Sequence, residues 1–319
     1  MSDPVPANQP ADSAYRGRFA PSPTGPLHFG SLVAALGSYL DARANAGQWL
    51  LRIEDVDAPR TVPGAADAIL RTLAAFGFEW DGEVLAQSRR LDRYHATLVR
   101  LQLDGEVYPC ACSRREIADA ATQASIDGGV AYPGTCRAGL PEGSAARSWR
   151  MRVSDRELCF SDRVQGRQSQ NLQRELGDFV LLRADGQYAY QLAVVLDDAA
   201  QGVNSVVRGA DLLDSTPRQI WLQQRLGVPT PHYAHLPVAT NAYGEKLSKQ
   251  TKAAAVDATR GSAALAEALI FLGHAVPQEL RGAPLAEFWR WAISAWSIGK
   301  VPAVRAIFPG SFPGQCLPP

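Results

Sequence analysis

The chain has 319 residues, of which 46% are hydrophobic and 20% charged, enough to bury one large core or two modest ones. No apolar run approaches the roughly 18 residues of a membrane span, and the N-terminus lacks the basic-then-apolar pattern of a signal peptide. Basic and acidic residues number 32 each, so charge neither supports nor excludes a nucleic-acid partner, and five cysteines, three of them in one short segment, favour a reducing cytoplasmic setting with a possible metal site over a disulfide framework.

The region before Asp57 predicts one strand–helix–strand unit behind a tail. Residues 1–14 are rich in proline, alanine and aspartate, which is typical of a disordered terminus. Apolar spacing then predicts a strand over 15–20, a helix over 31–47 and a strand over 49–53. A right-handed crossover would place the loop after the first strand, and the acidic pair Glu54-Asp55, at neighbouring carboxyl ends of a parallel sheet, where such sheets bind ligands.

The remaining elements alternate between helices and strands. Helices are predicted over 65–77, 90–103, 215–227, 262–273 and 285–297, and strands over 150–153, 179–182, 188–190, 203–207 and 237–239. Asp185-Gly186 is the turn signal of a hairpin before the strand 188–190. Residues 192–196 are apolar and fit either a helix or a strand.

These elements predict an α/β fold, a Rossmann-like doubly wound parallel sheet with an insertion and a short helical C-terminal part. The cysteine- and glycine-rich segment 106–147 is the expected insertion. The expected order is a tail over 1–14, catalytic halves over 15–105 and 148–257 around the insertion 106–147, a helical part over 258–307 and a proline-rich tail over 308–319.

Two short segments suit the phosphates of a nucleotide. Gly25 and Gly30 let backbone approach a phosphate at a helix start, and His28 can donate a hydrogen bond to it. Lys249, far downstream, supplies a positive charge for a phosphorus transition state. Each segment alone is more often a simple turn or a solvated loop. Their joint occurrence on an alternating α/β pattern favours a nucleotide site.

The same segments carry a family resemblance. His28-Phe-Gly-Ser31 resembles the HIGH signature of class I aminoacyl-tRNA synthetases, and Lys246-Leu-Ser-Lys-Gln250 resembles their KMSKS loop, with Gln250 in place of the final serine. The stretches that begin at Arg18 and at Arg52 look like the glutamyl and glutaminyl branch, over about residues 16–255. The resemblance implies His28 and Lys249 as catalytic residues and Mg²⁺ with the nucleotide. The implied ATP site comprises Gly25, His28, Gly30, Ser31, Lys246, Ser248 and Lys249.

A glutamate pocket should combine arginines for carboxylates with a carboxylate for the ammonium group. In the related synthetases, the positions that match Arg18 and Arg208 hold the side-chain carboxylate, and those that match Ser22 and Glu54 meet the ammonium group. A surface ion pair is the alternative for each charged residue, and Tyr188 competes with Tyr190 for a hydroxyl contact. The implied glutamate site comprises Arg18, Phe19, Ala20, Pro21, Ser22, Glu54, Tyr190 and Arg208.

The cysteine segment is a candidate metal site. Cys110, Cys112 and Cys136 supply three thiolates, whereas tetrahedral zinc takes four ligands and no histidine lies between residues 96 and 231. Ordinary reduced thiols therefore stay an alternative. Short relatives of the glutamyl-tRNA synthetases carry Cys-x-Cys and then Tyr-x-x-x-Cys around zinc, so the resemblance implies Tyr132 as the fourth ligand of one structural Zn²⁺. Cys159 and Cys316 have no evident partner.

The expected reaction depends on the length of chain beyond the Lys246 loop. Only about 65 residues remain there, too few for a separate anticodon-reading domain. The chain thus resembles truncated relatives that activate L-glutamate with ATP and transfer it to the queuosine base in the anticodon stem-loop of tRNA(Asp). The alternatives are charging of tRNA(Glu) at its 3′ end and a non-catalytic protein that binds adenylate or tRNA. We expect neither a membrane nor DNA as a partner.

Overall fold

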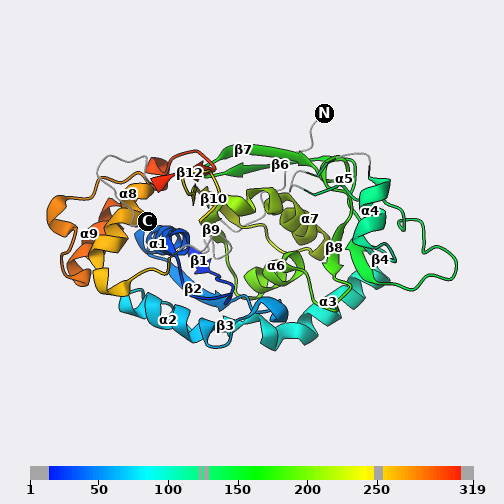
Figure 1. The fold of residues 1–319 in the computed structure, drawn as a ribbon, viewed down its shortest axis with the longest axis horizontal. Coiled ribbons are helices and arrows are strands. Elements are labelled where there is room, and N and C mark those ends of the chain that lie inside the picture. Colours follow the sequence, from blue (N-terminus) through cyan, green and yellow to red (C-terminus); the bar gives the residue numbers. More distant parts are fainter. Residues whose placement is uncertain (1–13, 122–123, 126–128, 248–253, 310–319) are drawn as a thin grey trace.

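A central parallel sheet organises the structure, a computed structural model that describes residues 14–121, 124–125, 129–247 and 254–309 (Figure 1). One part contains β1 (Arg16–Phe19), β2 (Gln48–Ile53) and β3 (Leu85–Ala86), and the other contains β7 (Gly166–Asn171), β6 (Glu157–Asp162), β10 (His232–Leu236) and β9 (Ser205–Gly209), each in that order. All neighbours are parallel except β6 and β7. The two parts meet where β1 lies beside β9, because the Asn204 N–H donates to the Arg16 carbonyl over 3.1 Å.

From this junction, β2 and β3 follow β1 on one side of the sheet, and β10 follows β9 on the other. Such a reversal is the topological switch point at which open α/β sheets bind ligands, outside the carboxyl ends of the strands. The predicted α/β class with a parallel sheet is therefore confirmed. The Glu54 N–H donates to the Pro21 carbonyl over 3.0 Å, so the loop after β1 and the end of β2 adjoin as predicted.

The helices of the catalytic part connect these strands. They are α1 (Phe29–Ala44), α2 (Ala65–Ala75), α3 (Leu91–Leu103), α6 (Tyr190–Ala200) and α7 (Thr216–Leu226). Short 3₁₀ turns lie at Ala58–Arg60, Gln87–Arg90, Ala210–Ser215, Ala258–Arg260, Gln278–Leu280 and Ile298–Lys300. The ends of α7 follow from its sequence: Pro217 stands in its first turn, and Gly227 ends it in the left-handed region at φ 67°.

A separate antiparallel sheet carries the cysteine segment. It has the order β4 (Val107–Cys110), β5 (Ser148–Met151) and β8 (Phe179–Leu182), with α4 (Arg114–Ala120) after β4 and α5 (Leu172–Glu175) before β8. The chain leaves this sheet after Cys110 and returns at Ser148, which are paired across β4 and β5. The excursion thus starts and ends at one place.

The C-terminal part packs against the start of the chain. Helices α8 (Ser262–Phe271) and α9 (Leu285–Ala295) bury apolar side chains in the same core as α1, and β12 (Ala306–Ile307) pairs in parallel with β11 (Val238–Ala239). The Trp289 indole N–H donates to the Phe76 carbonyl over 3.1 Å. No helix in the described ranges is both long and apolar enough to cross a bilayer.

One expectation is wrong, and several elements were not anticipated. The predicted strand 188–190 is wrong: Tyr188 makes one isolated bridge to Leu182, and Tyr190 begins α6. The same helix contains residues 192–196, for which the sequence fitted either a helix or a strand. Apolar residues are buried all around this helix, so periodicity could not identify it. The hairpin of β6 and β7 and the strand β10 were not anticipated, because β7 is largely polar and β10 ends at Leu236, directly before Pro237.

Candidate active site

A cleft of about 790 Å³ opens at the carboxyl ends of β1, β2 and β9. It brings together most of the residues predicted from the motifs, although they lie far apart along the chain. The predicted residues that line it are Arg18, Phe19, Ala20, Pro21, Ser22, His28, Gly30, Ser31, Glu54, Tyr190, Arg208 and Lys246. Gly25 is outside this lining and has a φ of 140°, a conformation that glycine tolerates. Ser248 and Lys249 lie outside the described residues.

His28 occupies the N-cap of α1 and lines the cleft. Its Nδ1 accepts a hydrogen bond from the Ser31 N–H over 3.4 Å, so a neutral ring carries its proton on Nε2. A Cβ on Gly30 would approach the His28 ring to 3.3 Å and the Leu247 carbonyl to 3.7 Å. Glycine therefore allows the ring and the second signature segment to lie close to the helix start.

Backbone hydrogen bonds hold the chain on both sides of the second signature segment. Leu247 donates to the Ala239 carbonyl over 2.7 Å, and Val256 donates to the Leu27 carbonyl over 2.9 Å. The residues that flank 248–253 on both sides are thus held against the sheet and against the loop before His28. Lys246 also forms an ion pair with Asp211, which lies just after β9.

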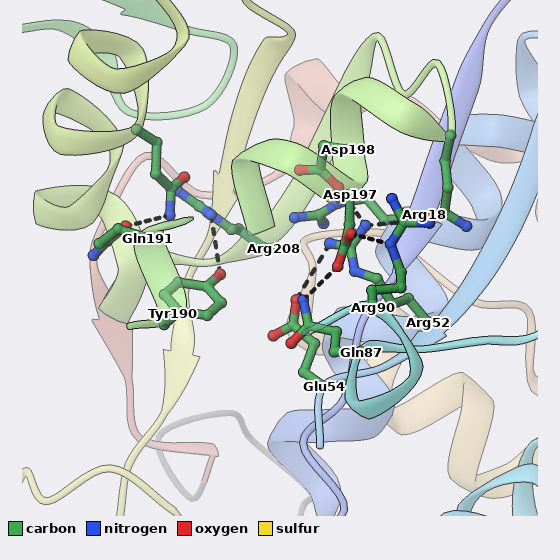
Figure 2. A network of polar contacts seen from close by, with 12 residues as sticks. Arg18, Arg52, Glu54, Gln87, Arg90, Tyr190, Gln191, Asp197, Asp198 and Arg208 are labelled. Carbon is green, nitrogen blue, oxygen red and sulfur yellow. Dashed lines mark hydrogen bonds and ion pairs between the residues drawn. The ribbon is translucent and has the colours of Figure 1, made fainter. Parts of the chain in front are cut away.

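A buried charge network joins β1 and β2 to helix α6 (Figure 2). Asp198 accepts from Arg52 over 2.7 Å and from Arg18 over 3.1 Å, and Arg52 reaches Glu54 over 3.2 Å. Burial opposes the charge of Asp198, but the two guanidinium groups outweigh it and lower its pKa. Burial raises the pKa of Glu54 despite the opposing effect of Arg52 and Arg18.

The neighbouring residue Asp197 anchors α6 from the other side. It accepts hydrogen bonds from Arg90 over 2.5 Å, from Tyr94 over 2.6 Å and from Gln87 over 3.0 Å. All of these donors precede Asp197 by more than one hundred residues. The network fixes the helix whose first residue is Tyr190, and so it sets where the Tyr190 side chain enters the cleft.

Arg208 lines the cleft from β9 and lies beside Tyr190. Its Nε donates to His235 Nε2 over 3.0 Å, one Nη donates to Thr216 Oγ1 over 2.9 Å, and the other donates to the Tyr190 hydroxyl over 3.4 Å. Burial, followed by the charge of Glu54, raises the pKa of Tyr190 to about 12. The hydroxyl therefore keeps its proton and can donate into the cleft. Tyr188, the other candidate, instead packs against Tyr94 with ring centroids 5.6 Å apart.

The three predicted cysteine ligands converge in the excursion between β4 and β5. The Sγ atoms of Cys110, Cys112 and Cys136 lie within 4.8 Å of one another, and the Tyr132 hydroxyl lies 3.4 Å from Cys110 Sγ and 3.9 Å from Cys112 Sγ. Burial opposes ionisation of Cys110, but hydrogen bonds from Tyr132 and Arg150 outweigh it and lower its pKa to about 7. The described cysteines are free thiols. Three cysteine sulfurs are ligands that suit zinc, and the Tyr132 hydroxyl is an oxygen that lies beside two of them.

Several residues of the site were missed in the sequence. Asp198, His235, Asp162 and Thr216 do not carry signature motifs, and each contacts a cleft arginine or its neighbour rather than the cleft itself. The adjacent acidic residues Asp197 and Asp198, inside an otherwise apolar run, were the one available signal, because buried carboxylates require partners.

Comparisons with known proteins identify the family. Residues 14–273 match the model of the tRNA synthetases class I (E and Q), catalytic domain. The chain is 65% identical to the glutamyl-Q tRNA(Asp) synthetase of Dechloromonas aromatica, over 91% of this chain and 97% of that protein. It is 61% identical to the protein of the same name from Aromatoleum aromaticum, over 93% and 94%.

A solved structure agrees with these matches. The glutamate tRNA ligase of Elizabethkingia meningosepticum, determined in complex with its amino acid, is 26% identical, with a TM-score of 0.73 over 92% of this chain and 67% of that one. Family model, relatives and fold therefore lead to one conclusion: the chain belongs to the class I tRNA synthetases of the glutamyl and glutaminyl type and is a ligase-type enzyme.

Proposed function

We propose that this enzyme activates L-glutamate with ATP and Mg²⁺, and then transfers the glutamyl group to the queuosine base in the anticodon stem-loop of tRNA(Asp), in the cytoplasm. The observation that carries the proposal is the convergence of Arg18, Glu54, Tyr190 and Arg208 in the same cleft as His28. The proteins that share 65% and 61% identity with this chain, both named glutamyl-Q tRNA(Asp) synthetase, support the choice of acceptor.

The glutamate side chain would bind between Arg208, Tyr190 and Arg18. Arg208 and Tyr190 offer an N–H and an O–H from adjoining positions, and both are donors that suit a carboxylate oxygen. Arg18 uses Nε for Asp198, which leaves its Nη groups toward a ligand carboxylate. Glu54 and Ser22, joined through the loop at Pro21, would receive the ammonium group.

Activation would be an in-line displacement at the α-phosphorus of ATP. An oxygen of the glutamate α-carboxylate forms the new P–O bond while the bond to pyrophosphate breaks, giving glutamyl-adenylate. His28 at the start of α1, with Gly25, Gly30 and Ser31, would hold the phosphates. Lys246, Ser248 and Lys249 would add charge and a hydroxyl on the pyrophosphate side, where Mg²⁺ accompanies the nucleotide.

Transfer would be attack of a queuosine hydroxyl oxygen on the activated carbonyl carbon. The carbon–oxygen bond to AMP breaks as the new ester bond forms, and the hydroxyl proton leaves with the departing phosphate or to water. The same cleft would thus serve both half-reactions, with glutamate held in place by the arginines throughout.

The cysteine cluster would hold one structural Zn²⁺ through Cys110, Cys112, Tyr132 and Cys136. Ionised ligands favour binding, and Arg150 supports the thiolate of Cys110, because its Nε donates to Cys110 Sγ over 3.3 Å. The Arg150 Cζ also lies 3.8 Å above the Tyr132 ring. Such a site would close the excursion between β4 and β5 and stabilise the fold of this region.

One experiment separates the candidate reactions. Enzyme, ATP and radiolabelled glutamate are incubated with tRNA(Asp) that carries queuosine, with tRNA(Asp) that lacks it and with tRNA(Glu), and ATP–pyrophosphate exchange is measured in parallel. The proposal expects exchange, and label only on the queuosine-containing tRNA(Asp). Label on tRNA(Glu) would support 3′-end charging instead, and absence of exchange with and without tRNA would leave only a binding role.

A further inference from the structure

Three neighbouring strands each contribute one buried side chain to a row behind the cleft. Asp162 ends β6, His235 lies in β10, and Arg208 lies opposite His235 in β9. None of the three is more than 5% exposed. Only Arg208 reaches the cleft, so the other two residues act through it.

The hydrogen bonds along this row fix the state of the imidazole. Asp162 Oδ2 lies 2.6 Å from His235 Nδ1, and the other oxygen accepts backbone N–H groups of Val164, Gln165 and His235 at 3.0, 2.8 and 3.1 Å. A carboxylate only accepts, so Nδ1 must carry the ring proton. Arginine only donates, so Nε2 must offer its lone pair to Arg208 Nε. Both neighbours therefore require the same neutral tautomer.

The electrostatic setting supports a neutral ring. Burial, together with the charge of Arg208, lowers the pKa of His235 to about 4, although Asp162 acts in the opposite direction. The pKa of Asp162 is also lowered, because hydrogen bonds from His235 and the backbone outweigh the effect of its burial. Carboxylate, neutral imidazole and guanidinium thus coexist at neutral pH.

The row restricts how Arg208 can turn. With Nε on His235 and one Nη on Thr216 at 2.9 Å, the plane of the guanidinium group is set by two fixed acceptors. The remaining Nη then faces Tyr190 and the cleft. Removing the His235 acceptor would leave a buried N–H without a partner and allow the group to rotate.

We propose that His235, oriented by Asp162, is a positioning residue that fixes Arg208 as a donor toward the ligand and so selects a side-chain carboxylate over the corresponding amide. The inference rests on the proposed glutamate site. An amide presents an NH₂ group to the same donors and leaves one of them unpaired, which is how a fixed polar site rejects a near-isosteric ligand.

The decisive variant is Asp162→Asn, which preserves shape. The oxygen of the new amide is retained by the three backbone N–H groups, so its NH₂ faces His235 Nδ1. The ring must then accept at Nδ1 and carry its proton on Nε2. That proton would face the Nε–H donor of Arg208, so the hydrogen bond between the two side chains would be lost. We expect KM for glutamate in ATP–pyrophosphate exchange to rise about tenfold to a hundredfold, with KM for ATP changed by less than about threefold and the preference for glutamate over glutamine reduced about tenfold.

The tautomer itself gives a readout that a merely structural role would not move. A long-range ¹H–¹⁵N spectrum of protein labelled with ¹⁵N-histidine shows which ring nitrogen is protonated, and we expect the proton of His235 to move from Nδ1 to Nε2 in Asp162→Asn. The matched control is Asp178→Asn, another buried aspartate, which accepts from Tyr108 and Arg137 away from the cleft. It should leave both the tautomer and the KM for glutamate unchanged.

A second pair of variants keeps the test valid if Asp162→Asn does not fold. His235→Gln retains an acceptor toward Arg208, whereas His235→Leu removes it, so only the leucine variant should lose affinity for glutamate and discrimination against glutamine. The proposal is overturned if a folded Asp162→Asn or His235→Leu variant keeps wild-type KM and discrimination, or if KM for ATP rises equally. Absence of glutamate-dependent exchange in the wild-type enzyme would instead refute the proposed function.

Discussion

The buried pairing of Asp198 with Arg18 and Arg52 makes a quantitative prediction for the variant Asp198→Asn. The carboxylate accepts at 3.1 Å and 2.7 Å from groups whose side chains are 3% and 0% exposed. Neutralising it removes the carboxylate that Arg18 contacts and leaves Arg52 in ion-pair contact with Glu54. Removing one partner of a buried ion pair costs about 3–5 kcal/mol, and the retained amide oxygen places our expectation at the lower end, about 3 kcal/mol.

The assay is urea unfolding followed by circular dichroism at about pH 8, where wild type and variant are compared by linear extrapolation. The pKa of Asp198 is lowered in the folded state. Its stabilising contribution is therefore complete above the unfolded pKa of about 3.9 and is lost as the pH falls through the folded value. The difference in free energy of unfolding should be constant down to about pH 5 and shrink at lower pH.

Asp155→Asn is the matched control, because Asp155 pairs with Arg174 while its side chain is 48% exposed. Water screens such a pair, so this variant should unfold at the wild-type urea midpoint. The reasoning is refuted if Asp198→Asn costs less than about 1 kcal/mol at pH 8, or if its deficit stays constant well below pH 4.

Three further predictions concern the cleft and the cysteine cluster. Tyr190→Phe removes a donor to the ligand and should raise KM for glutamate about tenfold in pyrophosphate exchange; since the pKa of Tyr190 is raised to about 12, the wild-type KM should show no inflection from this group up to about pH 10. Lys249→Ala should slow adenylate formation at least about a hundredfold in a single-turnover assay with unchanged circular dichroism, and an unchanged rate would remove Lys249 from the mechanism. Chelation or the Cys110→Ser substitution should lower the zinc content by about one ion per chain, measured by atomic absorption, and should lower the melting temperature. Cys159→Ser, at a cysteine outside the cluster, should change neither quantity.

The first strand–helix–strand unit could be predicted because its signals are local. Proline after β1, helical spacing in α1 and the apolar run of β2 each act within a few residues. The hairpin of β6 and β7 could not, because strand pairing rather than an apolar pattern defines it: β7 is largely polar and buries polar side chains such as Gln170, which is 3% exposed. Tyr190 illustrates the intermediate case: its place in the cleft was anticipated, but its element was not.

The candidate site divides in the same way. Arg18, His28, Glu54 and Lys246 line the cleft and lie in or beside the signature segments, so motifs could identify them. Asp198 and His235 do not line the cleft and act through cleft arginines. Asp198 contacts Arg18, which is 180 residues away in the chain, and His235 contacts Arg208, which is 27 residues away. Such partners depend on which strands become neighbours, and that is set by the tertiary fold rather than by local pattern.

The charges around the cleft explain why Arg208 should dominate recognition of the ligand carboxylate. Arg18 and Arg52 contact Asp198, and Lys246 contacts Asp211, so these cations are already paired with carboxylates. In the described ranges, Arg208 is held by a neutral imidazole, two hydroxyl groups and a carbonyl, with no carboxylate in ion-pair contact. A neutral acceptor orients the guanidinium without cancelling its charge, and the imidazole ring of His235 separates the Asp162 carboxylate from the guanidinium. An incoming carboxylate therefore meets a fixed, uncompensated cation in a buried setting, where charge–charge attraction is strongest.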